Sequence, residues 1–521
     1  MYEKEVAVHN VERLLQMAGN GHTYQLRVLL LFSIQWFIAS MIFSGYTLLF
    51  MPPKILCTNK DGVESLCTEE VACSQETTSY RFDPSSVHSL VYDFGLICSK
   101  ASIVDIGEPA RFLGALLGSF YYSDIQQKKG RLFALTQSIT LTAVAMMVSV
   151  LSFNAYLNII AWCCAAFGLF GFLNASVVYF CEISSENLRL LGPNVFCIFW
   201  AFGNIFLSLV SKWNNSWQFL CLCVMGIPLL ITAFFFRFMK DSPRHLVDME
   251  KFGEATVSLQ NIAKINNRRM AAEFHFENEV KLGLFGNSKA TAFFQTDSKE
   301  RAKNREGRSM MTLFKYASLK TPAWILLIFK IFITMANHGN LLAIDTFYPD
   351  YNQNLLTSGV IEVFGFILSA YCVLNFRRKV MFKTVFTTIG VVYLLFWLTG
   401  NKAGEINFNQ NSAFIIMLVI IGRLAVCIAY GNILVYICEV VPTSVRHYAF
   451  GLFTSASYFV LMFWANLVLA LRAKGLSPQF AVGVIFICFW QLMSYVPETL
   501  NHPLLEQIKE EDELLLNVEM Y

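Results

Sequence analysis

Long hydrophobic stretches dominate the chain, and short polar segments separate them. Twelve of these stretches have roughly the 20 residues that an α-helix needs to cross a bilayer. They lie near residues 27–50, 102–123, 131–151, 156–181, 191–211, 217–238, 322–346, 355–376, 380–399, 412–438, 448–470 and 477–496. Two longer polar segments, 51–101 and 239–320, follow the first and the sixth stretch. The pattern predicts an all-α membrane protein with twelve transmembrane helices, six on each side of the second polar segment.

A repeat relates the two predicted halves. The segment 179–189 recurs as 436–446, 257 residues later, and four residue types stay in register: Tyr179, Cys181, Glu182 and Arg189 become Tyr436, Cys438, Glu439 and Arg446. The same offset carries Asp241 onto Glu498. A parallel repeat in a very apolar chain is typical of transporters built from two six-helix bundles, with the substrate site between them. We therefore expect an N-terminal half (1–238, with an outer loop 51–101), an inner loop (239–320), and a C-terminal half with its tail (321–521).

Composition agrees with a membrane protein and gives its orientation. Only 15% of the residues are charged, against roughly 25% in soluble domains, and the net charge of +3 argues against a nucleic-acid partner. Short loops on one side hold nine basic residues and those on the other hold four. The nine are Lys128, Lys129, Arg131, Arg189, Arg377, Arg378, Lys379, Lys383 and Arg446. Because basic residues favour the inner side, both termini and the segment 239–320 are predicted to lie there.

Four of the fourteen cysteines lie in the outer loop: Cys57, Cys67, Cys73 and Cys98. An even number suits two disulfides if that side of the membrane is oxidising. The other ten fall in predicted spans, where cysteine acts as a small apolar residue. The outer loop has no Asn-x-Ser/Thr acceptor, so glycosylation gives no support to a cell-surface location.

Several short motifs follow one another in an order that resembles a known family. They are the segment 89–98, Asp241-Ser-Pro-Arg244, Gly422-Arg423 and Pro497-Glu-Thr499. In order and spacing they resemble the organic cation and anion transporters of the major facilitator superfamily, over nearly the whole chain except about 270–310. The resemblance implies the major facilitator fold, small organic ions or zwitterions as solutes, alternating access as facilitator or exchanger, and a plasma-membrane location.

Charged residues at the predicted inner helix ends are candidates for a cytoplasmic gate. Glu182 and Glu439 end helices, whereas Arg189 and Arg446 begin the next ones. We expect opposite charges to meet at the seam between the halves, as exposed pairs worth roughly 0–1 kcal/mol each that close and open readily. The candidate gate residues are Asp124, Arg131, Glu182, Arg189, Arg377, Glu439, Arg446, Asp241 and Glu498. The alternative interpretation is that these charges only set the membrane topology.

Some positions depart from the family pattern. The first inner loop of that family reads Asp-x-x-Gly-Arg, but here three extra residues separate Asp124 from Gly130 and Arg131. Asn375 stands where the second copy has an acid, and the fourth span lacks the usual arginine. These departures motivate a rival hypothesis: a transport-inactive, transporter-like subunit that serves a large membrane assembly with neighbouring subunits, for example in the mitochondrial inner membrane.

Ionisable residues within the predicted spans indicate a central cavity, because a charge in the bilayer core needs a partner or water. Lys330, His338 and Asp345 lie on the seventh span, Glu362 on the eighth and Arg423 on the tenth. We predict that Glu362 and Arg423 point into the cavity and meet there directly or through water. Glu362 as a substrate ligand remains the alternative.

The other candidate cavity residues do not determine whether the substrate is a cation or an anion. Lys330 and Asn337 stand where the resemblance implies Trp and Tyr, and Tyr458 occupies a position that is acidic in cation carriers and often Arg in anion carriers. The candidate cavity residues are Lys330, Asn337, Glu362, Arg423, Tyr458 and Trp200, and further aromatic candidates are Trp36, Tyr46, Tyr371 and Tyr430. No P-loop, His-Glu-x-x-His, Gly-x-Ser-x-Gly or Cys-x-x-Cys motif occurs, so we expect no enzyme activity, catalytic residue, cofactor or metal.

Overall fold

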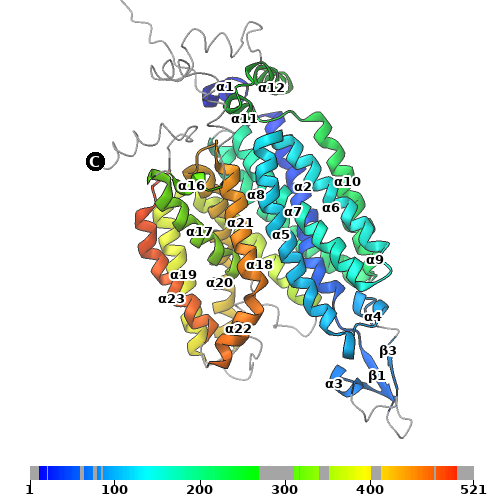
Figure 1. The fold of residues 1–521 in the computed structure, drawn as a ribbon. Helices are drawn as coiled ribbons and strands as arrows, with labels where there is room; N and C mark the ends of the chain where they lie inside the picture. The colour runs from blue at the N-terminus through cyan, green and yellow to red at the C-terminus, as the bar shows by residue number, and fades with distance from the viewer. Residues whose placement is uncertain are drawn as a thin grey trace, which may run out of the picture.

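The computed structural model describes residues 11–19, 21–58, 64–73, 79–83, 86–184, 186–214, 216–268, 310–315, 317–338, 351–399, 412–474 and 477–500. Within these ranges the chain is helical apart from one small sheet (Figure 1). The predicted basic stretch 299–308 and Asp345 lie outside the described residues.

The N-terminal half supplies six spans, coloured blue to green in Figure 1. Five are single helices: α2 (Thr23–Leu49), α5 (Ser102–Lys129), α6 (Arg131–Val150), α7 (Ala155–Ile183) and α8 (Glu186–Trp213). The sixth is composite, with α9 (Trp217–Phe219), the π-helical η2 (Leu220–Gly226), α10 (Ile227–Phe234) and η3 (Phe235–Phe238). Pro228 cannot donate to the carbonyl one turn earlier, and the wider π turn lies directly before it.

The C-terminal half supplies the other six spans, coloured green to red. They are α17 (Ala317–His338), α18 (Tyr351–Asn375), α19 (Arg378–Leu398), α20 (Ser412–Val440), α21 (Arg446–Met462) with α22 (Trp464–Ala473), and α23 (Pro478–Leu492) with η5 (Met493–Tyr495). Ten of the twelve spans are long and apolar enough to cross a membrane on composition alone. The other two are α5, which carries charges near its outer end, and α21, which breaks before α22.

Two helix pairs make the most extensive contacts between the halves, α5 with α21 and α8 with α18. Glycines allow the closest approaches. A Cβ on Gly118 would lie 1.9 Å from the carbonyl oxygen of Phe167 on α7, and one on Gly451 of α21 would lie 2.8 Å from the carbonyl oxygen of Ser119 on α5. Small residues at membrane helix crossings permit this backbone contact, so these glycines fix how α5 sits between its own half and the other.

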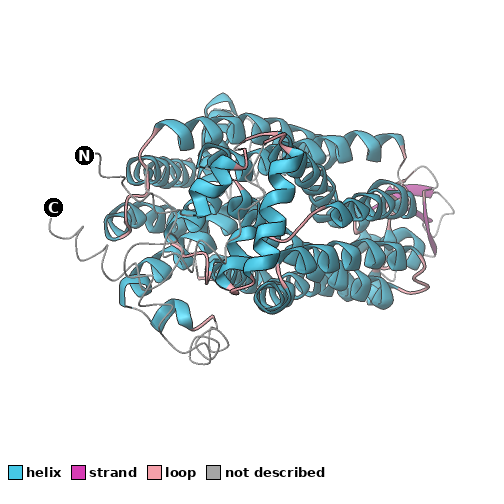
Figure 2. Ribbon diagram, turned by 90° about the horizontal axis from the view of Figure 1, so that it is seen from above, coloured by secondary structure: helices cyan, strands magenta, loops and turns pink. Residues whose placement is uncertain are grey.

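The outer loop folds into a disulfide-linked unit at one end of the helices, set apart at the edge of the molecule in Figure 2. Strands β1 (Ile55–Thr58), β2 (Glu64–Cys67) and β3 (Ser79–Phe82) form an antiparallel sheet in the order β2-β1-β3. Three short helices accompany it, α3 (Glu69–Ala72), α4 (Leu90–Phe94) and η1 (Cys98–Lys100).

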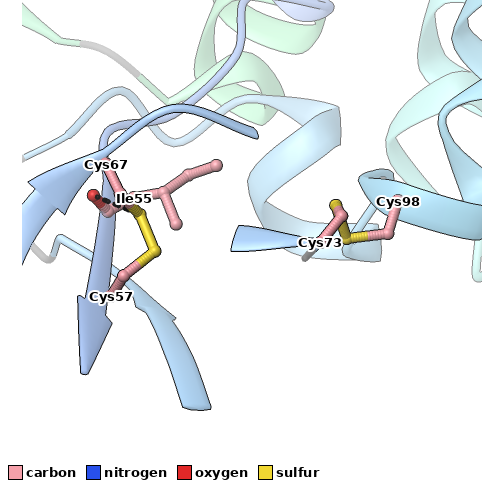
Figure 3. Close-up of a disulfide and its surroundings, with 5 residues drawn as sticks. All are labelled: Ile55, Cys57, Cys67, Cys73 and Cys98. Carbon is pink, nitrogen blue, oxygen red and sulfur yellow. Dashed lines mark hydrogen bonds between the residues drawn. A yellow bond between two sulfur atoms is a disulfide. The ribbon is translucent and has the colours of Figure 1, made fainter. Parts of the chain in front are cut away.

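The disulfides are Cys57–Cys67 and Cys73–Cys98 (Figure 3). The structure therefore agrees with the expectation of two disulfides. The sheet was not predicted.

A layer of short helices lies at the opposite end, which the distribution of basic residues predicts to be the inner one: α1 (Val11–Met17), α11 (Pro243–Asp248), α12 (Phe252–Ile265) and α16 (Thr312–Lys315). Asn266, directly after α12, ties this layer to the first span. Its Oδ1 accepts from the Tyr24 N–H at 2.8 Å, and its Nδ2 donates to the carbonyls of Ala18 and Gly19. The helices α1, α11 and α12 of this layer are thus attached to the N-terminal half, whereas α16 contacts α17 of the C-terminal half.

Candidate functional site

A narrow cavity lies between the two halves. The N-terminal half contributes the aromatic faces of Trp36 and Trp200, and the C-terminal half contributes the polar groups. Its wall is formed by Trp36, Cys197, Trp200, Asn337, His338, Glu362, Phe366 and Tyr430. A mostly aromatic wall with a few polar groups is the usual composition of a small-molecule site.

Glu362 and Arg423 form an ion pair in the wall of this cavity, between Oε1 and Nη2. Their side chains are 6% and 13% exposed, so the pair is largely out of water. Ser358 also donates to the Glu362 carboxylate, and Arg423 Nη1 donates to the carbonyl of Asn337 at 2.7 Å. The predicted contact between the two residues is confirmed.

The same carboxylate connects the two halves. Asn204 on α8 donates from Nδ2 to Glu362 Oε2 at 3.2 Å, and Ser44 on α2 donates to Asn204 Oδ1 at 2.8 Å. A polar chain therefore runs from the first span, through the cavity wall, to the tenth. Relative movement of the halves must break or rearrange the Asn204–Glu362 bond.

Lys330 lies behind the cavity wall and is 4% exposed. Its Nζ is 4.4 Å from the centroid of the Tyr430 ring, which lines the cavity. It also interacts electrostatically with Cys197, another wall residue. Among the described residues no carboxylate forms an ion pair with Lys330, in contrast to Arg423.

The other predicted cavity residues lie in three different positions. Trp200 and Asn337 line the cavity as expected. Tyr458 is buried one layer behind, with its ring 4.4 Å from Phe170 and 6.4 Å from the wall residue His338. Tyr371 is 57% exposed, so the suggestion that it lines the cavity is wrong: its ring points away from the bundle interior.

Three charged side chains meet at the inner end of the N-terminal half. Arg131, the first residue of α6, pairs with Glu182 near the end of α7, with Nη2 and Oε1 3.2 Å apart. The Asp241 carboxylate accepts from the backbone N–H groups of Arg131 and Leu132 and so caps α6. Gly130 permits this approach, because it has φ +96° and a Cβ there would lie 2.0 Å from Asp241 Oδ2.

The C-terminal half repeats this arrangement. Arg378, the first residue of α19, pairs with Glu439 at 2.9 Å, and Glu498 accepts from the N–H groups of Arg378 and Lys379. Sequence reasoning named the adjacent Arg377, but that side chain is exposed and Arg378 is buried. Arg377 is the N-cap of α19 and Arg378 is its first residue, so Arg378 and not Arg377 takes the place that Arg131 has at the start of α6.

Three expectations about the gate need correction. The ion pairs are buried rather than exposed, with the Arg131 and Glu182 side chains 1% and 0% exposed. They lie within each half, since each joins neighbouring helices of one bundle. Asp124 instead pairs with Lys128 in an exposed i, i+4 contact at 2.7 Å, because the extra residues continue α5 by another turn.

Contacts across the seam come from the start of α21. Arg131 Nη2 and His447 Nδ1 are 3.4 Å apart and join α6 to α21. Arg446, fully buried, interacts electrostatically with Glu182 of the other half. Arg189 is also buried at this level, at 2% exposure.

Two titratable groups of the inner layer have shifted pKa values. Burial raises the pKa of Asp241 above its usual range, although a backbone hydrogen bond from Ser242 and the charge of Arg131 oppose the shift. Burial lowers the pKa of His245 well below its usual range, and the cations Arg131 and Lys251 lower it further. Both side chains are therefore sensitive to how tightly this layer packs.

The described residues contain no group of three or more His, Cys, Asp or Glu side chains that could hold a metal ion. The site is thus an aromatic cavity with a buried ion pair, set between two bundles with matching inner charge clusters. This architecture defines a transporter of the major facilitator type.

Residues 109–510 match the sugar (and other) transporter family, and the chain belongs to that family. Human organic cation/carnitine transporter 2 is 21% identical over 421 residues, covering 81% of this chain and 71% of that protein. Arabidopsis thaliana organic cation/carnitine transporter 4 is 24% identical over 508 residues, covering 95% and 89%. The resemblance inferred from the short motifs is confirmed, as that of a divergent member.

Solved structures show the same fold. The proton:xylose symporter XylE bound to 6-bromo-6-deoxy-D-glucose superposes with a TM-score of 0.62 at 16% identity, covering 96% of this chain and 98% of that one. The protein is thus a multi-pass integral membrane transporter of the major facilitator type, related to organic cation and sugar transporters, and these relatives are not enzymes.

Proposed function

We propose that this protein carries small organic ions or zwitterions across a membrane by alternating access, as a facilitator or exchanger. The observation that carries the proposal is the cavity between the halves, whose wall includes a buried ion pair bonded to both bundles. The Asn204–Glu362 hydrogen bond joins the two bundles. A solute that breaks this bond on binding would therefore favour relative movement of the bundles.

The duplicated inner clusters support the same proposal. Each half retains an Arg–Glu pair and a helix-capping carboxylate. A closed inner end held by these groups is one state of a two-state element. The rival hypothesis, a transport-inactive structural subunit, was motivated by the displaced Asp124, by Asn375 in place of an acid and by the missing arginine of the fourth span. The Arg131–Glu182 and Arg378–Glu439 pairs that both halves retain favour transport instead.

The outer disulfides bear on the membrane in which the protein works. Disulfides persist where the adjoining compartment is oxidising. We infer a plasma-membrane location, or another membrane of the secretory route, rather than the mitochondrial inner membrane. Imaging of a tagged protein against markers of both membranes tests this.

Uptake into liposomes that contain the purified protein tests the transport proposal. Saturable uptake of an organic ion, with exchange against the same unlabelled ion, is the expected result. Absence of uptake across cations, anions and zwitterions, together with native mass spectrometry of a large assembly containing the chain, would replace the proposal with the structural-subunit hypothesis.

A further inference from the structure

Two cysteines of the sequence repeat meet where the halves join at the inner end. Cys181 lies near the end of α7 and Cys438 near the end of α20, and each directly precedes the glutamate of an inner ion pair. A hydrogen bond links the two thiols, and both residues are 0% exposed. Because each half contributes one thiol, a bond between the two sulfurs would join the halves covalently.

Basic side chains lie beside these two thiols. Arg189 and Arg446 both act electrostatically on the two sulfurs, and the carboxylate of Glu182 opposes them at Cys181. Cations beside a thiol stabilise the thiolate, which is the form that attacks an oxidant. The site therefore combines two thiols in contact with surroundings that suit their oxidation.

The position of the two thiols in the molecule gives their resting state. They lie at the end of the bundle opposite to the two disulfides of the outer loop, on the side that the basic residues predict to be the inner one. Thiols that face the cytosol are kept reduced. We therefore expect both cysteines to be free at rest, as they are in this structure.

We propose that Cys181 and Cys438 form a redox-sensitive pair, which a peroxide converts into a disulfide that locks the inner end shut. The inference rests on the proposed alternating access, because the buried sulfurs reach an oxidant only when the inner end opens. Closure then brings the two sulfurs back into contact. The duplicated segment that supplies the inner ion pairs thus also supplies a reversible stop for the movement of the halves.

One peroxide is consumed for each disulfide. In the open state one thiolate attacks a peroxide oxygen, the O–O bond breaks, and the departing hydroxide combines with the proton that the thiol gave up. The product is a sulfenic acid. On closure the second thiol attacks the sulfenic sulfur, the S–S bond forms and the S–O bond breaks, and the released hydroxide takes the thiol proton as a second water. Two electrons and two protons pass from the thiols to the peroxide.

Treatment of the purified full chain in liposomes with hydrogen peroxide tests the proposal. The remaining thiols are then blocked, and digestion without reductant followed by mass spectrometry identifies linked peptides. We expect a peptide that joins Cys181 to Cys438 and that disappears with dithiothreitol. While the link is present, hydrogen exchange of the backbone amides of residues 441–447 should slow severalfold, because exchange there requires the inner end to open.

Variants assign both effects to this pair. Cys181→Ala and Cys438→Ala should each lose the linked peptide and the slower exchange, and both should fold, since a buried free thiol packs as a small apolar group. Cys427→Ala is the matched control, because Cys427 is a buried free cysteine of the same helix α20, about three turns before Cys438. It should keep both effects. The linked peptide of the wild type decides the proposal if an alanine variant does not fold.

Alkylation of the unoxidised protein by N-ethylmaleimide separates this inference from the proposed transport. Alkylation of Cys181 and Cys438 without any linked peptide after peroxide would show that the inner end opens, and would overturn the redox pair alone. Neither alkylation nor a linked peptide would overturn the inference and also count against alternating access. A linked peptide that leaves the exchange of 441–447 unchanged would overturn the lock.

Discussion

Arg131 and Glu182 form an ion pair, with Nη2 and Oε1 3.2 Å apart, whose side chains are 1% and 0% exposed. The pair joins the start of α6 to the end of α7. Because both charges have left water, neither is stable without the other. The inner end of each half is therefore stabilised by a buried ion pair between two neighbouring helices, and not by weak pairs of exposed charges.

Glu182→Gln should destabilise the protein strongly, because it leaves the Arg131 guanidinium buried without its counter-charge. We expect a loss of about 3–5 kcal/mol in the free energy of unfolding. Glu439→Gln should have a similar effect through Arg378, since that pair is equally enclosed on the arginine side, at 1% exposure. Denaturant unfolding in detergent, followed by tryptophan fluorescence, measures both.

Glu254→Gln is the control for these substitutions. Its partner Lys251 is 54% exposed and Glu254 is 64% exposed, so the change should cost no more than about 1 kcal/mol. A Glu182→Gln variant as stable as Glu254→Gln would show that the buried pair does not hold the inner end.

The cavity ion pair should show strong coupling in a double-mutant cycle. Glu362→Gln and Arg423→Gln each leave one buried charge without its ionic partner, so each should cost about 3–5 kcal/mol. The double variant should be less destabilised than the sum of the two, because no uncompensated charge remains. Unfolding free energies of the four proteins give the coupling.

A matched cycle on Glu64 and Arg81 sets the reference. That pair is also short, at 2.6 Å, but its side chains are 45% and 62% exposed. It should couple by less than about 1 kcal/mol. Equal coupling in the two cycles would mean that the cavity pair is solvated rather than buried.

Features that depend on local sequence were predicted well. The twelve spans follow from apolar length, and the repeat related Glu182 to Glu439 and Asp241 to Glu498, which occupy equivalent places in the two clusters. Glu362 and Arg423 were paired because neither can remain charged alone inside a bilayer.

Features that depend on helix phase or distant pairing were missed. Three extra residues continue α5 past Asp124, which turns its carboxylate towards Lys128. Of the adjacent Arg377 and Arg378, only the structure shows that Arg377 is the exposed N-cap of α19 and that Arg378 is the buried first residue that pairs with Glu439. The outer sheet depends on pairing of β1 with β3 across some twenty residues, and its exposed β2 and β3 lack the alternating apolar pattern that identifies a half-buried strand.

The outer unit should depend on its disulfides while the helical bundle does not. Its apolar cluster, built around Ile55, Cys57, Val91 and Ile97, is small and separate from the main core. Replacing Cys73 and Cys98 by serine opens a link across 25 residues, which should cost about 3 kcal/mol locally. We expect faster proteolysis within 51–101 and unchanged unfolding of the helices.

Cys488→Ser serves as the control, because Cys488 is an exposed free cysteine on α23. It should change neither proteolysis nor unfolding. If the disulfide variant resists proteolysis as the wild type does, the remaining Cys57–Cys67 disulfide and the hydrogen bonds of the sheet are sufficient to hold the outer unit.

The buried His245 should make the protein less stable in mild acid. Burial and the nearby cations lower its folded pKa well below the usual range, whereas the unfolded chain takes up a proton near pH 6.5. The unfolded state therefore binds more protons as the pH falls, so the stability is fully present above about pH 6.5 and is lost below it. Between pH 7.5 and pH 5.5 the loss from this one group should be about 1.3 kcal/mol in the free energy of unfolding.

His245→Phe should remove that part of the slope of the unfolding free energy against pH. Comparing the variant with the wild type at each pH cancels the contribution of the neighbouring Asp241. His88→Gln, which changes an exposed histidine of the outer unit, should leave the slope as it is. A His245→Phe slope equal to that of the wild type would mean that His245 is protonated in the folded protein.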